Sequence, residues 1–224
     1  MRRKEIGINE HAVLYAVLAK ALFQHADNAE HLLKEITESY GYRRGKRMRA
    51  NAERLGLGNG IPAYFRCGEW RGLPDENRSV LIQGEHRAES LVEVCGWYET
   101  WKKYGLPEYG TWYCRWIDRA IVRGFSEQVM LAIPESKGRG DENCRFVFTE
   151  TDEAKNPGPD AKETASMILP FSFHCRELYC TAEEILRKRI SDQAELILSA
   201  AEQEYRKITG EEDFSFLNRE SEGI

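Results

Sequence analysis

The spacing of the apolar residues changes in the middle of this chain, and the change limits the folds that the chain can adopt. Over residues 90–95 polar and apolar side chains alternate, which is typical of a strand with one buried face. Over residues 112–121 the apolar side chains recur at helical spacing, which predicts a helix that ends at Gly124. Residues 129–133 and 144–149 then flank a turn-rich connection, which predicts a hairpin of two strands.

Two amphipathic helices are predicted before this central part. The first covers residues 9–23 with Asn9 as its N-cap, and the second opens at residue 27 or 28 and runs to Leu55. Gly41 and Gly45 lie one turn apart in the second helix. They lower its helix propensity but permit close approach of another backbone or of a ligand.

The remaining segments complete an α+β fold. Residues 56–84 contain six glycines and two prolines, and we interpret them as an ordered loop with one short element around Tyr64. Residues 181–184, Thr-Ala-Glu-Glu, fit a capping box that opens a long C-terminal helix toward Gly210. N-terminal helices, a small antiparallel sheet with a hairpin and this helix imply the α+β class. We interpret residues 1–224 as a single domain of four parts: N-terminal helices (9–56), a central α+β segment (88–149), a loop insertion (150–165) and a C-terminal helical segment (172–209).

Charge and composition exclude several classes of protein. A net charge of -5 repels a phosphate backbone, so nucleic acid is not an expected partner. The apolar run over residues 12–23 contains Lys20, is too short to span a bilayer and lacks a small-residue cleavage site. We therefore expect no membrane association and a cytoplasmic location, where the 6 cysteines stay thiols.

Cys114 and Asp118 are the first candidates for chemistry, because a spacing of four places thiol and carboxylate on one face of the central helix. A buried thiol beside a carboxylate has a raised pKa, so a nucleophilic Cys114 needs a nearby cation. His174 and the arginines are candidates for that cation. The alternative is a buried structural cysteine beside a salt-bridged aspartate.

Three cysteines that lie in separate predicted elements are candidates for a metal site. Cys95, Cys114 and Cys144 could meet at one sheet, and with His174 such a set would suit zinc. The paired ligand spacing that is typical of zinc sites does not link these cysteines. We expect no metal and no other cofactor, with zinc as the alternative.

A cluster of cations interrupts this acidic chain over residues 42–49. Arg43 and Arg47 share a helix face, and together with Arg44 they are suited to bind a carboxylate or phosphate through paired hydrogen bonds. The alternative is a solvated cationic face that forms salt bridges. His174 also has two interpretations: it is either a general base or a residue of the core. Aromatic residues that can either wall a pocket or pack a core are Trp97, Trp101, Trp112, Tyr113 and Trp116.

One pattern runs through the central segment: Cys95, Trp101, Gly105-Leu106, Tyr113-Cys114, Asp118, Gly124-Phe125, Gly140-Asp141, Cys144 and Phe146-x-Phe148. Together with Tyr42-x-Arg44-Gly45-x-Arg47-Met48, this pattern resembles the L-2-amino-thiazoline-4-carboxylic acid hydrolase family over most of residues 10–200. The family often has proline after its first cysteine, where this chain has Gly96.

The resemblance implies a cytoplasmic hydrolase that opens the cyclic amidine of a carboxylate-bearing heterocycle. In that reaction Cys114 is the nucleophile or a shaping thiol, Asp118 holds a proton or the amidinium, and His174 assists as a base. One of Arg43, Arg44 and Arg47 binds the substrate carboxylate. The other expected substrate-binding residues are Cys95, Trp101, Tyr113 and Cys144.

A second resemblance supports a different function. The stretch from Gly140 to Phe146 also resembles ligand-binding domains of the 4-vinyl-reductase type, which are α+β and serve as sensors. The competing hypothesis is therefore a non-catalytic small-molecule-binding module, which pairs as a homodimer by the same analogy. A sensor needs an output partner, and the sequence shows no helix-turn-helix and no long linker, so an enzyme is favoured.

Overall fold

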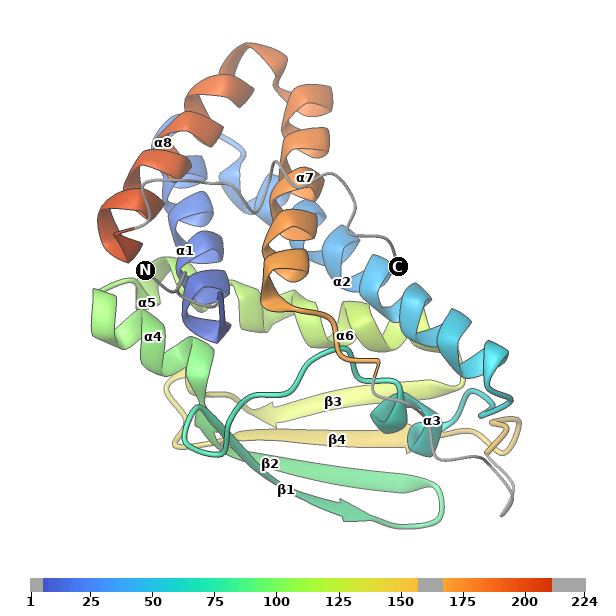
Figure 1. The fold of residues 1–224 in the computed structure, drawn as a ribbon. Helices are drawn as coiled ribbons and strands as arrows, with labels where there is room; N and C mark the ends of the chain where they lie inside the picture. The colour runs from blue at the N-terminus through green and yellow to red at the C-terminus, as the bar shows by residue number, and fades with distance from the viewer. Residues whose placement is uncertain (1–5, 157–166, 211–224) are drawn as a thin grey trace. The chain divides into compact units, whose positions relative to one another are not determined.

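The computed structural model describes residues 6–156 and 167–210, and these form two units (Figure 1). The first, here called the helical unit, contains residues up to Ile36, then Gly96–Tyr113 and the chain from Pro170. The second, here called the sheet unit, contains Thr37–Cys95 and Cys114–Leu169. Helices and one antiparallel sheet together confirm the predicted α+β class.

The helical unit is built around α1 (Ile8–His25), which is buried along most of its length. It contacts α4 (Gly96–Tyr104), α5 (Pro107–Gly110), α7 (Phe171–Arg189) and α8 (Ser191–Thr209). A helix that is apolar on all sides, as α1 is from Ala12 to Ala19, is stable only when neighbours cover it completely. The four surrounding helices supply that cover.

The first predicted N-cap is wrong. Gly7 is the N-cap of α1, and its N–H donates to Glu10 Oε2 at 2.9 Å. Asn9 lies inside the helix, where its side-chain oxygen accepts a hydrogen bond from the Thr100 hydroxyl at 2.5 Å. Local propensity favours Asn9 as a helix cap, but in the fold its side chain is bound by Thr100, which lies 91 residues away in the sequence.

The predicted C-terminal helix is also different. The sequence predicts one helix that opens at Thr181, but Thr181 is fully buried inside α7, which begins ten residues earlier. The chain turns at Ile190, where φ is -144° and ψ is 57°, and continues as α8 to Thr209. The turn lets α7 and α8 pack on each other and both on α1, so tertiary packing determines these boundaries.

The sheet unit contains four strands in the order β1-β2-β4-β3, all antiparallel. The predicted strand and hairpin are confirmed as β2 (Arg87–Cys95), β3 (Val129–Glu135) and β4 (Cys144–Glu150). The fourth strand, β1 (Asn77–Gln83), was not predicted. It lies at the sheet edge with its side chains mostly exposed. Its sequence therefore lacks the alternation of polar and apolar residues that identifies a half-buried strand.

The two faces of this sheet differ in chemistry because side chains alternate along each strand. In the register of β2 with β4, Ser90 pairs with Phe146 and Ala88 with Phe148, and these residues face α3 (Ile61–Arg66) and α6 (Tyr113–Phe125). Figure 1 shows α3 and α6 on the same side of the sheet. Residue 64 lies in α3, so the short predicted element is confirmed.

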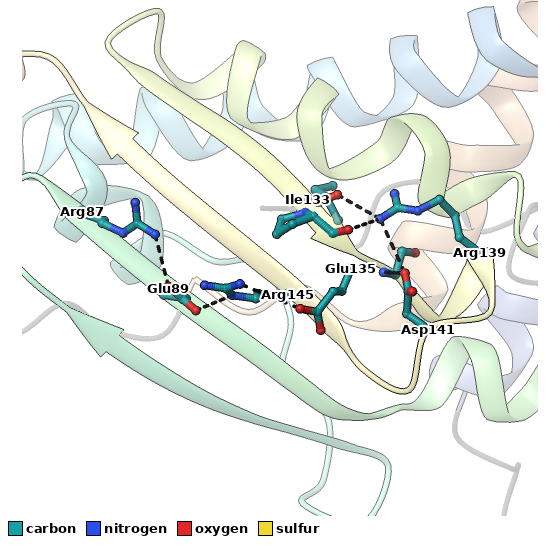
Figure 2. A network of polar contacts seen from close by, with 9 residues as sticks. Arg87, Glu89, Ile133, Glu135, Arg139, Asp141 and Arg145 are labelled. Carbon is teal, nitrogen blue, oxygen red and sulfur yellow. Dashed lines mark hydrogen bonds and ion pairs between the residues drawn. The ribbon is translucent and has the colours of Figure 1, made fainter.

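The opposite face carries a row of charges. Figure 2 shows Arg145 between two carboxylates, with Nε 2.5 Å from Glu89 Oε1 and Nη1 3.8 Å from Glu135 Oε1. Arg87 adds a contact to Glu89 at 3.3 Å. This face is thus solvated, and the apolar core of the unit lies on the helical side.

Close backbone contact joins α2 (Ala29–Arg54) to α6 within the sheet unit. A Cβ atom added at Gly45 would lie 2.1 Å from the Ile121 carbonyl oxygen, and one at Gly124 would lie 2.3 Å from the Tyr42 carbonyl oxygen. Gly41 is similarly close to Ala120. The sequence predicts that Gly41 and Gly45 permit close approach of another backbone or of a ligand, and the structure confirms the first: the neighbour is the backbone of α6.

Replacing Gly45 by alanine is expected to destabilise the protein by at least about 2 kcal/mol, because the two helix backbones must separate. Denaturant unfolding of the purified variant measures this loss. Gly84→Ala is the matched control, since a Cβ there lies at an ordinary 3.4 Å from its nearest neighbour. Equal unfolding free energies for the two variants would contradict the close contact.

The predicted loop insertion begins with an anchored residue. Glu150 is buried, and its Oε2 accepts the Ile61 N–H at 2.6 Å while its Oε1 accepts Asn156 Nδ2–H at 2.8 Å. The carboxylate therefore caps α3 and ties residues 150–156 to it. Residues 157–165, which make up the rest of the predicted insertion, lie outside the described residues.

Candidate active site

A pocket of about 420 Å³ opens in the sheet unit, between the inner face of the sheet and the helices α2, α3 and α6. This volume suits a small organic ligand. Its apolar lining is largely aromatic, and its polar lining contains two acids and two arginines. The aromatic residues are Tyr64, Phe65, Trp70, Phe146 and Phe148, and the charged residues are Arg44, Glu69, Arg71 and Asp118.

Asp118 supplies a carboxylate to this pocket from α6. It is half-buried, and it forms no hydrogen bond or ion pair with another side chain among the described residues. Burial raises the pKa of Asp118 to about 6, although the Arg44 and Arg119 charges and its own backbone N–H lower it. Both protonation states are therefore populated near neutral pH, as proton transfer requires.

Glu69, which the sequence interpretation missed, organises the arginines. Its side chain is only 1% exposed and accepts two hydrogen bonds from Arg47, at 2.8 Å from Nε and 3.1 Å from Nη2. Arg44 Nε lies 3.4 Å from Glu69 Oε2, and its guanidinium also lies 5.6 Å from the Tyr40 ring centre. A buried carboxylate paired with two arginines is satisfied and holds both in place.

The predicted carboxylate-binding arginines thus have different surroundings. Arg44 is buried and lines the pocket. Arg47 binds Glu69 and does not line the pocket, and Arg43 is exposed to solvent. Of the three, Arg44 alone is placed to act on a molecule in the pocket.

Tyr64 is a second missed residue. Its ring is fixed by the rings of Phe65, Phe125 and Phe148, with centres 5.4, 5.5 and 5.4 Å away. Its hydroxyl donates no hydrogen bond within the described part of the chain. Burial, and then the charge of Asp118, raises the pKa of Tyr64 above its usual range. The phenol therefore stays protonated and can donate a hydrogen bond to a ligand.

Cys95, Cys114 and Cys144, the three predicted site cysteines, lie near one another but do not line the pocket. Burial raises the pKa of Cys114 well above its usual value, and Cys95, Asp118 and Cys144 raise it further. Cys144 Sγ accepts the Lys137 N–H at 3.3 Å. These groups lie within electrostatic reach of one another, and the raised pKa values keep Cys114 and Cys144 as thiols. No three His, Cys, Asp or Glu side chains of the described residues are arranged to hold a metal ion.

Three further predicted site residues belong to the helical unit. Trp101 is fully buried and donates Nε1–H to the Ala12 carbonyl at 2.8 Å. Tyr113 is packed against Tyr15, with ring centres 4.8 Å apart, and His174 is buried against Phe171 and Phe173. None of the three lines the pocket of the sheet unit, and their roles at a site stay predictions.

The residues that were missed share a segment with little sequence signal. Tyr64, Glu69 and Arg71 lie in the glycine-rich stretch of residues 56–84, where the sequence predicts a short element around Tyr64 and loop elsewhere. The available signal was the run Gly68-Glu69-Trp70-Arg71-Gly72, in which opposite charges and an aromatic residue lie between glycines. Such a run in an ordered loop is typical of a binding segment.

The sheet unit thus combines an antiparallel sheet, helices on one face of the sheet, and an aromatic pocket with a carboxylate that has no side-chain partner among the described residues, the arrangement of an α+β protein. Residues 7–148, which include all residues that line this pocket, match the family model described as L-2-amino-thiazoline-4-carboxylic acid hydrolase. The chain belongs to this family. Searches of curated proteins and of solved structures found no match. No helix of the described residues is long and apolar enough to cross a membrane.

Proposed function

We propose that this protein is a hydrolase that opens a small cyclic amidine bearing a carboxylate, such as 2-aminothiazoline-4-carboxylate. The observation that carries the proposal is Asp118, a half-buried carboxylate without a partner among the described residues, in a pocket with aromatic walls. A planar amidinium stacks on aromatic rings and donates hydrogen bonds to a carboxylate. The family description supports the same substrate class.

The proposed reaction uses Asp118 as a proton carrier. Its carboxylate accepts a proton from water while the water oxygen bonds to the amidine carbon, which gives a tetrahedral centre. This centre collapses when the bond between that carbon and a ring heteroatom breaks. The heteroatom keeps the electron pair and takes the proton back from Asp118, so one water is consumed and the enzyme is regenerated.

Tyr64 stabilises the charge that develops in this step. Its phenol lines the same pocket and remains protonated, so it donates a hydrogen bond to the tetrahedral oxygen or to the departing heteroatom. The three surrounding rings restrict its orientation before the substrate arrives. A donor fixed in advance lowers the barrier more than one that must reorient.

Cys114 has a shaping role in this proposal and is not the nucleophile. Attack by sulfur requires the thiolate, and burial together with neighbouring acids disfavours that form. Cys114 lies one turn before Asp118 on α6, where its small, weakly polar side chain fills space beside the carboxylate without carrying charge. Water is therefore the attacking group.

Turnover of a panel of cyclic amidines by the purified protein tests the function. We expect ring opening of 2-aminothiazoline-4-carboxylate, and we expect Cys114→Ala to retain the rate within about tenfold, whereas loss of a nucleophile costs about 10³-fold or more. Absence of turnover for every cyclic amidine would contradict the hydrolase. Ligand binding without turnover would instead support a non-catalytic binding module.

A further inference from the structure

Two arginines line the pocket, and they differ in what they bind within the protein. Arg44 is 4% exposed and interacts with Glu69 and with the Tyr40 ring. Arg71 is exposed, and with the described residues it forms no hydrogen bond and no ion pair. Its five N–H donors are therefore available to a molecule in the pocket.

The segment that carries Arg71 is anchored at Glu69, through the side chain and the backbone carbonyl of that residue. The Glu69 side chain is held by Arg44 and Arg47, and the Glu69 carbonyl accepts the Leu169 N–H at 2.8 Å. Trp70 also lines the pocket. Arg71 follows two residues after Glu69, so its backbone is fixed at the pocket while its long side chain keeps freedom to reach a ligand.

The charged side chains that line the pocket are of two kinds: some form ion pairs within the protein and others do not. Glu69 is satisfied by arginines, whereas Asp118 and Arg71 have no partner among the described residues. An unpaired carboxylate and an unpaired guanidinium in one pocket are complementary to a molecule with one positive and one negative group. A carboxylate-bearing amidine is such a molecule.

We propose that Arg71 binds the carboxylate of the ligand and thereby selects acidic heterocycles over neutral or purely cationic ones. This inference rests on the proposed function for its substrate class, with Asp118 facing the amidinium. Arg71 is a specificity residue in this arrangement and takes no part in proton transfer. Arg44 also lines the pocket, but its guanidinium is engaged by Glu69, which leaves Arg71 as the arginine of the lining that forms no ion pair with the described residues.

Binding of two saturated probes tests the inference independently of catalysis. Thiazolidine-4-carboxylate and thiazolidine lack the amidine carbon, so neither is open to the proposed hydrolysis. Calorimetric titration of the full chain is expected to show about a tenfold to hundredfold preference for the carboxylate, as one charge-assisted contact gives. Arg71→Gln is expected to abolish the preference without weakening thiazolidine binding.

Arg66→Gln is the matched control, because Arg66 is an exposed arginine of α3 that does not line the pocket. It should keep the wild-type preference. A preference that persists in Arg71→Gln, or failure of the wild type to bind either probe, overturns the role of Arg71. If the preference is lost in Arg71→Gln but the wild type opens no cyclic amidine, the Arg71 site stands and the hydrolase proposal fails.

Discussion

Replacing Asp118 by asparagine is expected to lower kcat by about 10²- to 10⁴-fold, the range that a general acid–base group contributes. The amide keeps the size of the side chain and its place on α6, but it cannot accept a proton from water. Steady-state turnover of 2-aminothiazoline-4-carboxylate measures the loss. Asp75→Asn is the matched control, because Asp75 is exposed and does not line the pocket. Equal rates for the two variants would remove Asp118 from the mechanism.

The pH dependence of the wild-type rate follows from the pKa of Asp118. The reaction needs the carboxylate form, and the pKa of about 6 means that this form grows between pH 5 and 7. The rate should therefore rise over that range and then level off. Asp118→Asn should remove this rise from any residual activity.

Asp118→Asn should also stabilise the fold near neutral pH. The folded-state pKa of about 6 lies above the unfolded value near 3.8, so the folded protein binds more protons between these values. Stability is then lost as pH rises from about 4 to 6, and asparagine avoids up to about 3 kcal/mol of that loss. Thermal unfolding at pH 7 measures the gain. Lower activity combined with higher stability is the signature of a carboxylate kept for function.

The sequence predicted the parts of the fold that carry their own periodicity. The hairpin of β3 and β4 and helix α6 each show a two-residue or helical repeat because each buries one face. Strand β1 is exposed on both faces and shows none. The boundary at Ile190 was missed for a different reason, since apolar residues continue at helical spacing through α7 and α8, although three basic residues end α7 and Asp192 lies in the first turn of α8.

The residues of the candidate site likewise divide into those with a local sequence pattern and those without one. The spacing of Cys114 and Asp118 located the face of α6, and Asp118 does line the pocket, although Cys114 does not. Arg44 came from a charge cluster that is visible in sequence. Glu69 acquires its role from arginines 22 and 25 residues away, so only the folded chain reveals it. Long-range pairing of this kind has no local pattern to detect.

The second large effect is expected at Glu69. Glu69→Gln keeps the shape of the side chain but removes the charge that compensates Arg44 and Arg47. Arg44 is 4% exposed, so its charge would lose the Glu69 carboxylate in a poorly solvated position. Breaking a buried pair by removing one partner costs about 3 to 5 kcal/mol. Denaturant unfolding should show a loss of that size, together with weaker ligand binding because the Arg71 segment loses its anchor.

Glu53→Gln provides the control that separates burial from charge pairing. Glu53 pairs with Arg49 at 2.6 Å, a shorter contact than either arginine makes with Glu69, but its side chain is 60% exposed. An exposed pair of this kind contributes about 0.2 to 1 kcal/mol. The burial of Glu69 and its second arginine partner therefore predict a several-fold larger loss for Glu69→Gln than for Glu53→Gln. If both variants lose less than about 1 kcal/mol, the Glu69 cluster neither stabilises the sheet unit nor anchors the segment that carries Arg71.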